Sequence, residues 1–208
     1  LRHRGPDQQG GVGERRCILG HARLRVVDLS TAADLPMESS DGNVCIAYNG
    51  EVTNFRDLRR DFHLDGRYEF RTSSDTEVLL YLYQELGIDF CRHLSGMFAF
   101  ALHDRRADKV WLVRDQYGMR PLFLMRTANR LYFASEIKAF LDLPEFRRDL
   151  DLEGIFHYFT LAYIPGRHTP FKAIEELPGG CCVHIDLASG NCHEETYYAV
   201  SFAPDQQL

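Results

Sequence analysis

The sequence predicts an α+β domain in which antiparallel sheets are layered with helices. Strand-like segments come in groups, helical segments cluster between those groups, and the two kinds do not alternate regularly. Regular alternation would instead favour a doubly wound parallel sheet. The chain has 208 residues, nearer to one large domain than to two, and its 45% hydrophobic content is enough for a core. We therefore expect one globular α+β domain.

The first strands are predicted over Cys17–Asp28 and Asn43–Val52, two stretches rich in aliphatic residues, the second closed by the turn-favouring dipeptide Asn49-Gly50. Helices follow. Phe55–Leu64 has apolar residues at helical spacing, and Ser74 with Glu77 has the spacing of a capping box ahead of an apolar run.

The second half of the chain predicts a meander of antiparallel hairpins, then short helices and a last hairpin at Ser189-Gly190. Strands are expected at Gly96–Asp104, Lys109–Asp115, Leu122–Met125 and Leu131–Ala134, and helices at Glu136–Leu143 and Leu152–Tyr163.

Composition excludes several functions. A net charge of -6 argues against nucleic acid as a partner, and apolar runs of at most six residues, such as Met97–Leu102, are too short to span a membrane. The six cysteines have no C-x2-C spacing, which predicts no metal site and favours reduced thiols in a cytoplasmic protein. Cys17 and Cys45 are expected to be small buried hydrophobes.

The ends of the chain suggest a piece of a longer protein. The sequence begins at Leu1, in a basic stretch without the apolar region of a signal peptide. It finishes on polar residues at Pro204–Gln207, a composition typical of a connection between domains.

Polar residues in strand-like positions are the candidates for chemistry. Arg23 lies in an apolar strand, so its guanidinium needs an anionic partner, either a ligand or an intramolecular carboxylate. Asn49-Gly50-Glu51 places an amide donor, a flexible N–H and a carboxylate together, as in an oxyanion hole, or is simply a hairpin turn. Asp75 is expected at or next to a helix N-terminus, where capping alone would explain its carboxylate.

Four ordered motifs resemble one family, the glutaminase domain of asparagine synthetases. They are His3-Arg4-Gly5-Pro6-Asp7, His21-Ala22-Arg23-Leu24, Asn49-Gly50-Glu51 and Ser74-Asp75-Thr76-Glu77. Similar later motifs are Leu94–Ala101, Arg114-Asp115 with Gly118 and Pro121-Leu122, and Ala134–Ala139. The resemblance spans nearly the whole chain, so residues 1–208 are expected to form one class II glutamine amidotransferase domain. The proline of the first motif favours the asparagine synthetase branch.

The resemblance implies an N-terminal nucleophile hydrolase fold, a four-layer αββα sandwich with antiparallel sheets. It implies that an N-terminal cysteine attacks the side-chain amide of L-glutamine, releasing ammonia and leaving a thioester. Asn49 and Gly50 would stabilise the oxyanion, while Arg23 would bind the α-carboxylate of glutamine and Asp75, with Glu51, its α-ammonium. The stretch that includes Val26 and Val27 would line the pocket through backbone groups.

Two parts of the family pattern lie outside this sequence. None of the six cysteines opens the chain, so the segment with the nucleophile is expected before Leu1, and the 208 residues as they stand are expected to be inactive as a glutaminase. The pyrophosphate loop of a synthetase domain is also not found, so ATP and Mg²⁺ are expected in a downstream domain that amidates aspartate, and no cofactor in this one. A homodimer, a catalytically dead glutamine-binding scaffold and a different ammonia acceptor stay open.

Overall fold

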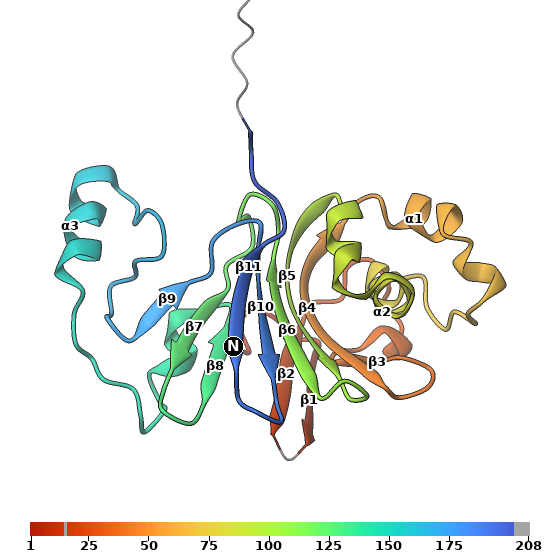
Figure 1. The fold of residues 1–208 in the computed structure, drawn as a ribbon, viewed down its shortest axis with the longest axis horizontal. Coiled ribbons are helices and arrows are strands. Elements are labelled where there is room, and N and C mark those ends of the chain that lie inside the picture. The colour runs from red at the N-terminus through yellow and green to blue at the C-terminus, as the bar shows by residue number, and fades with distance from the viewer. Residues whose placement is uncertain (15, 202–208) are drawn as a thin grey trace, which may run out of the picture.

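The computed structural model describes residues 1–14 and 16–201. Two antiparallel sheets face each other, and α1 and α2 cover the outer face of the larger one (Figure 1). The larger sheet has the order β11-β10-β6-β5-β4-β3, formed by Cys192–Thr196, Cys181–Asp186, Lys109–Arg114, Gly96–Asp104, Val44–Val52 and Met37–Glu38. The smaller has the order β8-β7-β9, formed by Leu131–Ala134, Phe123–Arg126 and Ile174–Glu176.

The remaining elements flank these sheets. Strands β1 (Gln8–Glu14) and β2 (Cys17–Arg23) form a separate hairpin, and β2 contacts β4. The helices are α1 (Phe55–Asp61), α2 (Asp75–Leu86) and α3 (Leu152–Leu161). Short 3₁₀ turns lie at Thr31–Ala33, Leu64–Gly66, Gly87–His93 and Ile137–Phe140.

Three hydrophobic clusters separate the layers. On β4, Ile46 and Tyr48 pack toward α2, whereas Cys45 and Ala47 pack toward the smaller sheet, the two-residue period of a strand buried on both faces. Beyond the smaller sheet, Phe140 packs on its outer face. The order is therefore helices, sheet, sheet and a last layer that includes the 3₁₀ turn at Ile137–Phe140.

Helix α2 begins where the sequence predicts. The Oγ of Ser74 accepts the N–H of Glu77 at 3.4 Å, as expected for the N-cap. The Glu77 carboxylate does not accept from the Ser74 N–H, as a capping box would require. It accepts instead from the N–H groups of Arg71 and Thr72, which fixes the segment before the helix. Nine of the twelve residues of α2 are buried, so the helix is anchored in the core.

Most predicted strands and helices are confirmed within two or three residues, but two predictions are wrong. The strand over Cys17–Asp28 stops at Arg23, because the chain then leaves the sheet as a loop with exposed apolar side chains. The helix over Glu136–Leu143 is only a 3₁₀ turn at Ile137–Phe140. Of the two interpretations of Asn49-Gly50, the hairpin turn is excluded, because β4 continues through it and pairs with Ala99 and Phe98 of β5.

The strands of the predicted meander are divided between the two sheets. Asp115 lies where the chain passes from the larger sheet to the smaller one. Its carboxylate accepts the N–H groups of Phe98, Tyr117, Met119 and Arg120 at 2.9 to 3.2 Å, which holds the loop between β6 and β7. The aspartate of the Arg114-Asp115 motif therefore has a structural role in this loop. No helix in residues 1–14 and 16–201 is long and apolar enough to cross a membrane. The connection between domains predicted at Pro204–Gln207 lies outside the described residues.

Candidate active site

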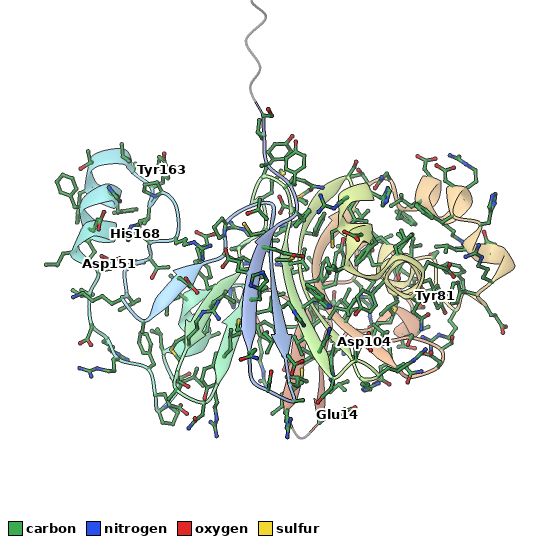
Figure 2. All side chains as sticks on the ribbon, viewed as in Figure 1. Glu14, Tyr81, Asp104, Asp151, Tyr163 and His168 are labelled. Carbon is green, nitrogen blue, oxygen red and sulfur yellow. The ribbon has the colours of Figure 1, made fainter. Side chains whose placement is uncertain are left out.

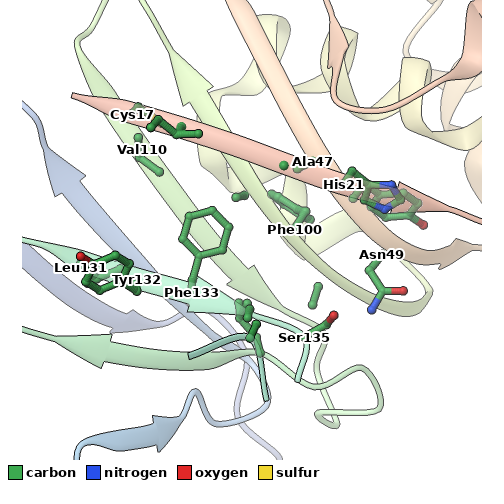
Figure 3. A pocket seen from close by; sticks show the side chains of 18 of the residues that line it. Cys17, His21, Ala47, Asn49, Phe100, Val110, Leu131, Tyr132, Phe133 and Ser135 are labelled. Carbon is green, nitrogen blue, oxygen red and sulfur yellow. The ribbon is translucent and has the colours of Figure 1, made fainter. Parts of the chain in front are cut away.

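A cavity of about 1590 Å³ lies between the two sheets (Figure 3). One wall is formed by β2, β4, β5 and β6, with Ala47 and Val110 among its residues, and the opposite wall by β7 and β8, with Leu131 and Phe133. The walls between the sheets carry apolar side chains, and a smaller number of polar groups line the cavity with them, as is usual for a ligand site.

Six of the seven predicted site residues line this cavity. They come from the end of β2 and the loop after it, from β4, and from the start of α2: Arg23, Val26, Val27, Asn49, Gly50 and Asp75. The seventh, Glu51, is exposed on β4 and is not part of the lining. The fold therefore brings together residues that are as much as 52 positions apart, from Arg23 to Asp75.

Asn49 carries an unsatisfied donor. Its Nδ2 atom is buried and has no hydrogen-bond partner among the described residues. Figure 3 shows the side chain directed toward the part of the cavity where Ser135 lies. A buried unpaired donor costs about 1 to 3 kcal/mol of stability. A ligand oxygen that accepts from Nδ2 would remove this cost, so the group is suited to binding an acceptor.

Gly50 directs its N–H toward the same end. Gly50 is paired with Phe98 of β5, whose main-chain groups are directed toward β6. The Phe98 N–H donates to the Asp115 carboxylate at 3.2 Å, and the Phe98 carbonyl oxygen accepts from the Asp115 N–H at 2.8 Å. The Gly50–Phe98 pair is therefore one without ladder hydrogen bonds, and the Gly50 N–H points to the opposite edge of β4. A Cβ at this position would lie 2.2 Å from the carbonyl oxygen of Met97, so only glycine fits.

Asp75 is a buried carboxylate held by three donors. It accepts from the Tyr48 hydroxyl at 2.7 Å, from the N–H of Val52 at 3.0 Å and from the N–H of Thr76 at 2.9 Å. Burial, together with this carboxylate, raises the pKa of Tyr48, which keeps the hydroxyl protonated as a donor. The carboxylate is fixed in position at the N-terminus of α2 and presents negative charge to the cavity.

Arg23 is buried and already has partners within the protein. Its guanidinium donates to Asp34 at 2.8 Å and to the carbonyl oxygens of Asp28 at 2.6 Å and Ser30 at 3.3 Å. Arg25 also pairs with Asp34, at 2.7 Å. The structure thus contains the intramolecular salt bridge that the sequence left as an alternative, and Arg23 organises the loop that follows β2.

That loop is tied to the start of α2 through Asp28. Its carboxylate accepts from the N–H and the hydroxyl of Ser73 at 2.9 and 3.1 Å and from the N–H of Ser30 at 2.8 Å. Hydrogen bonds from Ser30 and Ser73 lower the pKa of Asp28 to about 2. The side chains of Val26 and Val27 are exposed, so these residues can contribute mainly backbone groups.

The first and last family motifs meet at the mouth of the cavity. Glu136 pairs with Lys138 at 2.9 Å, Arg4 at 3.0 Å and His3 at 3.1 Å. Partial burial raises the pKa of Glu136, but hydrogen bonds from these three residues outweigh it and bring the pKa to about 2. A Cβ on Gly5 would lie 2.1 Å from the backbone of Ala22, so this turn packs directly on β2.

Sequence reasoning assigned no role to Tyr48 or to the side chain of His21, both of which lie at the site. Tyr48 orients Asp75. His21 lines the cavity, and burial lowers its pKa to about 4, so the ring is neutral at pH 7. The inward-facing period of β4 could have indicated Tyr48; the position of His21 depends on the contact between β2 and β4.

Cys17 and Cys45 are buried, as predicted, whereas Cys192 is exposed. Burial raises the pKa of Cys17 to about 11 and that of Cys45 to about 12, so neither is a good thiolate nucleophile near pH 7. In the described part of the chain, no group of three or more His, Cys, Asp or Glu residues is arranged to hold a metal ion.

Residues 1–198 match the family model of the glutamine amidotransferase domain. The chain belongs to this family and is a class II glutamine amidotransferase domain. This amidotransferase domain is 38% identical over 182 residues to asparagine synthetase [glutamine-hydrolyzing] 3 of Bacillus subtilis, covering 85% of the chain and 29% of that protein. It is 43% identical over 140 residues to asparagine synthetase B of Escherichia coli, covering 67% of the chain and 25% of that protein.

Solved structures confirm the fold of the amidotransferase domain. Glutamine phosphoribosylpyrophosphate amidotransferase from B. subtilis superposes with a TM-score of 0.60 at 21% identity, covering 87% of this chain and 35% of that one. The fold is therefore of the N-terminal nucleophile hydrolase type, mixed α and β with antiparallel sheets, as predicted. The domain spans less than a third of the length of the two asparagine synthetases named above.

Proposed function

We propose that this amidotransferase domain hydrolyses L-glutamine to glutamate and ammonia as part of a longer protein. The observation that carries the proposal is the convergence of Asn49, Gly50 and Asp75 at one end of the cavity. Among the described residues, the Asn49 Nδ2 and the Gly50 N–H have no side-chain or ladder partner, and Asp75 adds a fixed negative charge to the same cavity. Glutamine has groups for both, an amide carbonyl oxygen and an α-ammonium. The printed names of the related synthetases, which call them glutamine-hydrolyzing, support the same reaction.

In the proposed reaction the nucleophile is the N-terminal cysteine that the family resemblance implies. Its thiolate bonds to the amide carbon of glutamine, and the carbonyl π electrons move onto oxygen. Asn49 Nδ2 and the Gly50 N–H donate to this oxyanion, which carries more charge than the ground-state carbonyl. Ammonia leaves with the proton held by the α-amino group, and water then hydrolyses the thioester to glutamate.

The other residues are proposed to hold the amino acid end of glutamine. Asp75 is placed to pair with the α-ammonium, with Glu51 adding negative charge nearby. Arg23 is proposed to bind the α-carboxylate, which requires its guanidinium to share or exchange the contact with Asp34. Backbone groups at Val26 and Val27 would complete this side of the pocket.

The proposed fate of the ammonia is the ATP-dependent amidation of aspartate. This step is assigned to a synthetase domain of the same polypeptide that holds ATP and Mg²⁺, on the strength of the names of the relatives. The test uses the complete natural protein with glutamine, ATP, magnesium and aspartate, and measures glutamate, asparagine and pyrophosphate. Ammonium replaces glutamine in a parallel reaction.

The outcomes separate three functions. Glutamate and asparagine together support the proposal. Glutamate release with another carboxylate consumed in place of aspartate keeps the glutaminase and replaces the acceptor. If glutamine is bound but never hydrolysed by the complete protein, the domain is a glutamine-binding scaffold and the proposal fails.

A further inference from the structure

Helix α3 exposes a long apolar surface. From Gly154 to Gly166 there is no Asp, Glu, Lys or Arg, and most of the large side chains in and beside the helix face solvent. Phe159 is 82% exposed. The exposed set is Leu150, Leu152, Phe156, Tyr158, Phe159, Leu161 and Tyr163. Aromatic enrichment with depletion of charge is typical of the centre of a protein interface.

The packing of α3 within the domain is too small to account for its stability. Gly154 is its one buried residue, and the helix has ten residues. An isolated helix of this length is marginal in water. Its N-terminus is fixed, since the Asp151 carboxylate accepts from Glu153 and Gly154 and also pairs with His168 at 2.9 Å. The helix is therefore held at one end and presents the rest of its surface outward (Figure 2).

A second exposed apolar cluster is formed by the loop after β6 and the segment after β11. Tyr117 and Tyr198 form an edge-to-face pair with ring centroids 5.9 Å apart, and Tyr117 is 70% exposed. Met119 and Val200 are exposed beside them in sequence. Figures 1 and 2 show α3 and the segment after β11 on the side of the sheets opposite the β1–β2 hairpin, where Glu14 lies.

We propose that α3 and the Tyr117–Tyr198 cluster form the docking surface for a further domain of the same polypeptide. The occupant corresponds to the part of the asparagine synthetase relatives that this chain does not span, about 70% of the B. subtilis protein. The inference rests on the proposed function, in which ammonia passes to a second domain. A covalently attached partner needs no high intrinsic affinity, because tethering supplies a high effective concentration.

Hydroxyl-radical footprinting of the complete natural protein tests this surface. The side chains of Phe156, Phe159 and Tyr163 are expected to lose most of their modification. The reference is Ile18, which is 77% exposed and belongs to the β1–β2 hairpin, on the side of the sheets opposite α3 in Figure 1. Modification of Phe159 as strong as that of Ile18 would overturn the proposal. Protection that disappears when the protein is diluted to a monomer would assign the surface to a second copy and also overturn it.

A substitution at Phe159 tests whether protection of α3 depends on its apolar surface. Phe159→Glu in the complete protein places a charge in the centre of the surface, and the expected outcome is renewed modification of Tyr163 and Phe156. The matched control is Ile18→Glu, which changes an equally exposed apolar side chain elsewhere and should leave α3 protected. Unchanged protection in the folded Phe159→Glu protein contradicts the docking surface. Footprinting needs no glutamine, so a failed glutaminase assay and a failed docking surface are separate results.

Discussion

The two sides of the candidate site are built differently. The side formed by β4 and α2 is fixed: Asp75 has three hydrogen bonds and Gly50 fits against Met97 with no room for a Cβ. The side formed by the loop after β2 is a polar assembly in which buried Arg23 and the more exposed Arg25 share Asp34, while the valines face solvent.

This difference assigns the two sides to different tasks. Stabilising a transition state requires donors that are positioned before the reaction, and a buried strand provides that. Binding the charged end of a substrate tolerates adjustment, and a loop whose arginine already has an anionic partner can exchange that partner for a ligand. We therefore expect changes on the β4 and α2 side to affect the fold and turnover, and changes on the loop side to affect substrate binding.

The largest effect on stability is expected in the core beneath the fixed side. Leu80→Ala on α2 removes a fully buried side chain and should lower the free energy of unfolding by about 2 to 5 kcal/mol. Val26→Ala on the loop side changes a side chain that is 71% exposed and should stay within about 0.5 kcal/mol of the parent. Denaturant titration compares the two. Equal losses would remove the distinction between the sides.

Asn49→Ala should lower kcat for glutamate release by about 100- to 1000-fold with little change in KM, the usual effect of deleting one oxyanion donor. The variant should also fold normally, since Nδ2 has no partner to lose among the described residues. Asn191→Ala, in an exposed hairpin, is the matched control. Normal turnover of Asn49→Ala in the complete protein would place the oxyanion donors elsewhere.

Arg23→Ala should raise the KM for glutamine by about 10- to 100-fold, the value of one hydrogen bond to a charged group, with a smaller effect on kcat. Asp34→Asn separates the two functions of this arginine, because it weakens the salt bridge and keeps the guanidinium. A KM that rises only in Arg23→Ala supports substrate binding. Equal KM values in the two variants indicate that Arg23 acts only by organising the loop.

The smallest expected effect is a pH dependence of the Asp28 hydrogen bonds, which join the loop after β2 to the start of α2. The pKa of Asp28 is about 2 in the folded protein and about 4 in an unfolded chain. A lowered folded pKa stabilises the protein above pH 4, and this contribution is lost as the pH falls from about 4 to about 2. The stability difference between the parent and Asp28→Asn should therefore shrink over this range. A constant difference would show that the ionised carboxylate is not the link.

The sequence predicted the regular parts of the fold well, because they depend on local signals. Ser74 is the N-cap of α2, and Gly96–Asp104 is a strand with both predicted ends. The alternative of a hairpin turn at Asn49-Gly50 was wrong because pairing with β5 overrides the local preference of that dipeptide. The cross-strand partner of Gly50 is Phe98, which lies 48 residues further along the chain, so nothing in the local sequence indicates this pairing.

The site was predicted as a set of residues but not as a geometry. Family motifs selected Arg23, Asn49 and Asp75, and these residues line one cavity. The salt bridge from Arg23 to Asp34 depends on how the loop folds back on itself, and the hydrogen bond from Tyr48 to Asp75 depends on packing between β4 and α2. These contacts join segments whose separation in sequence hides them. The exposure of α3 was likewise not indicated by its helical pattern.

The end of the cavity beside Asp75 is proposed to recognise the amino acid end of glutamine. Calorimetric titration measures this with L-glutamine and with its analogue that lacks the α-amino group. The protein is the complete chain with the expected N-terminal cysteine changed to alanine, so that glutamine is bound but not consumed. We expect tighter binding of L-glutamine, and a loss of that preference when folded Asp75→Asn is added, because this change keeps the shape of the side chain and removes its charge. An equal preference for L-glutamine with Asp75 and with Asn at this position would exclude this recognition.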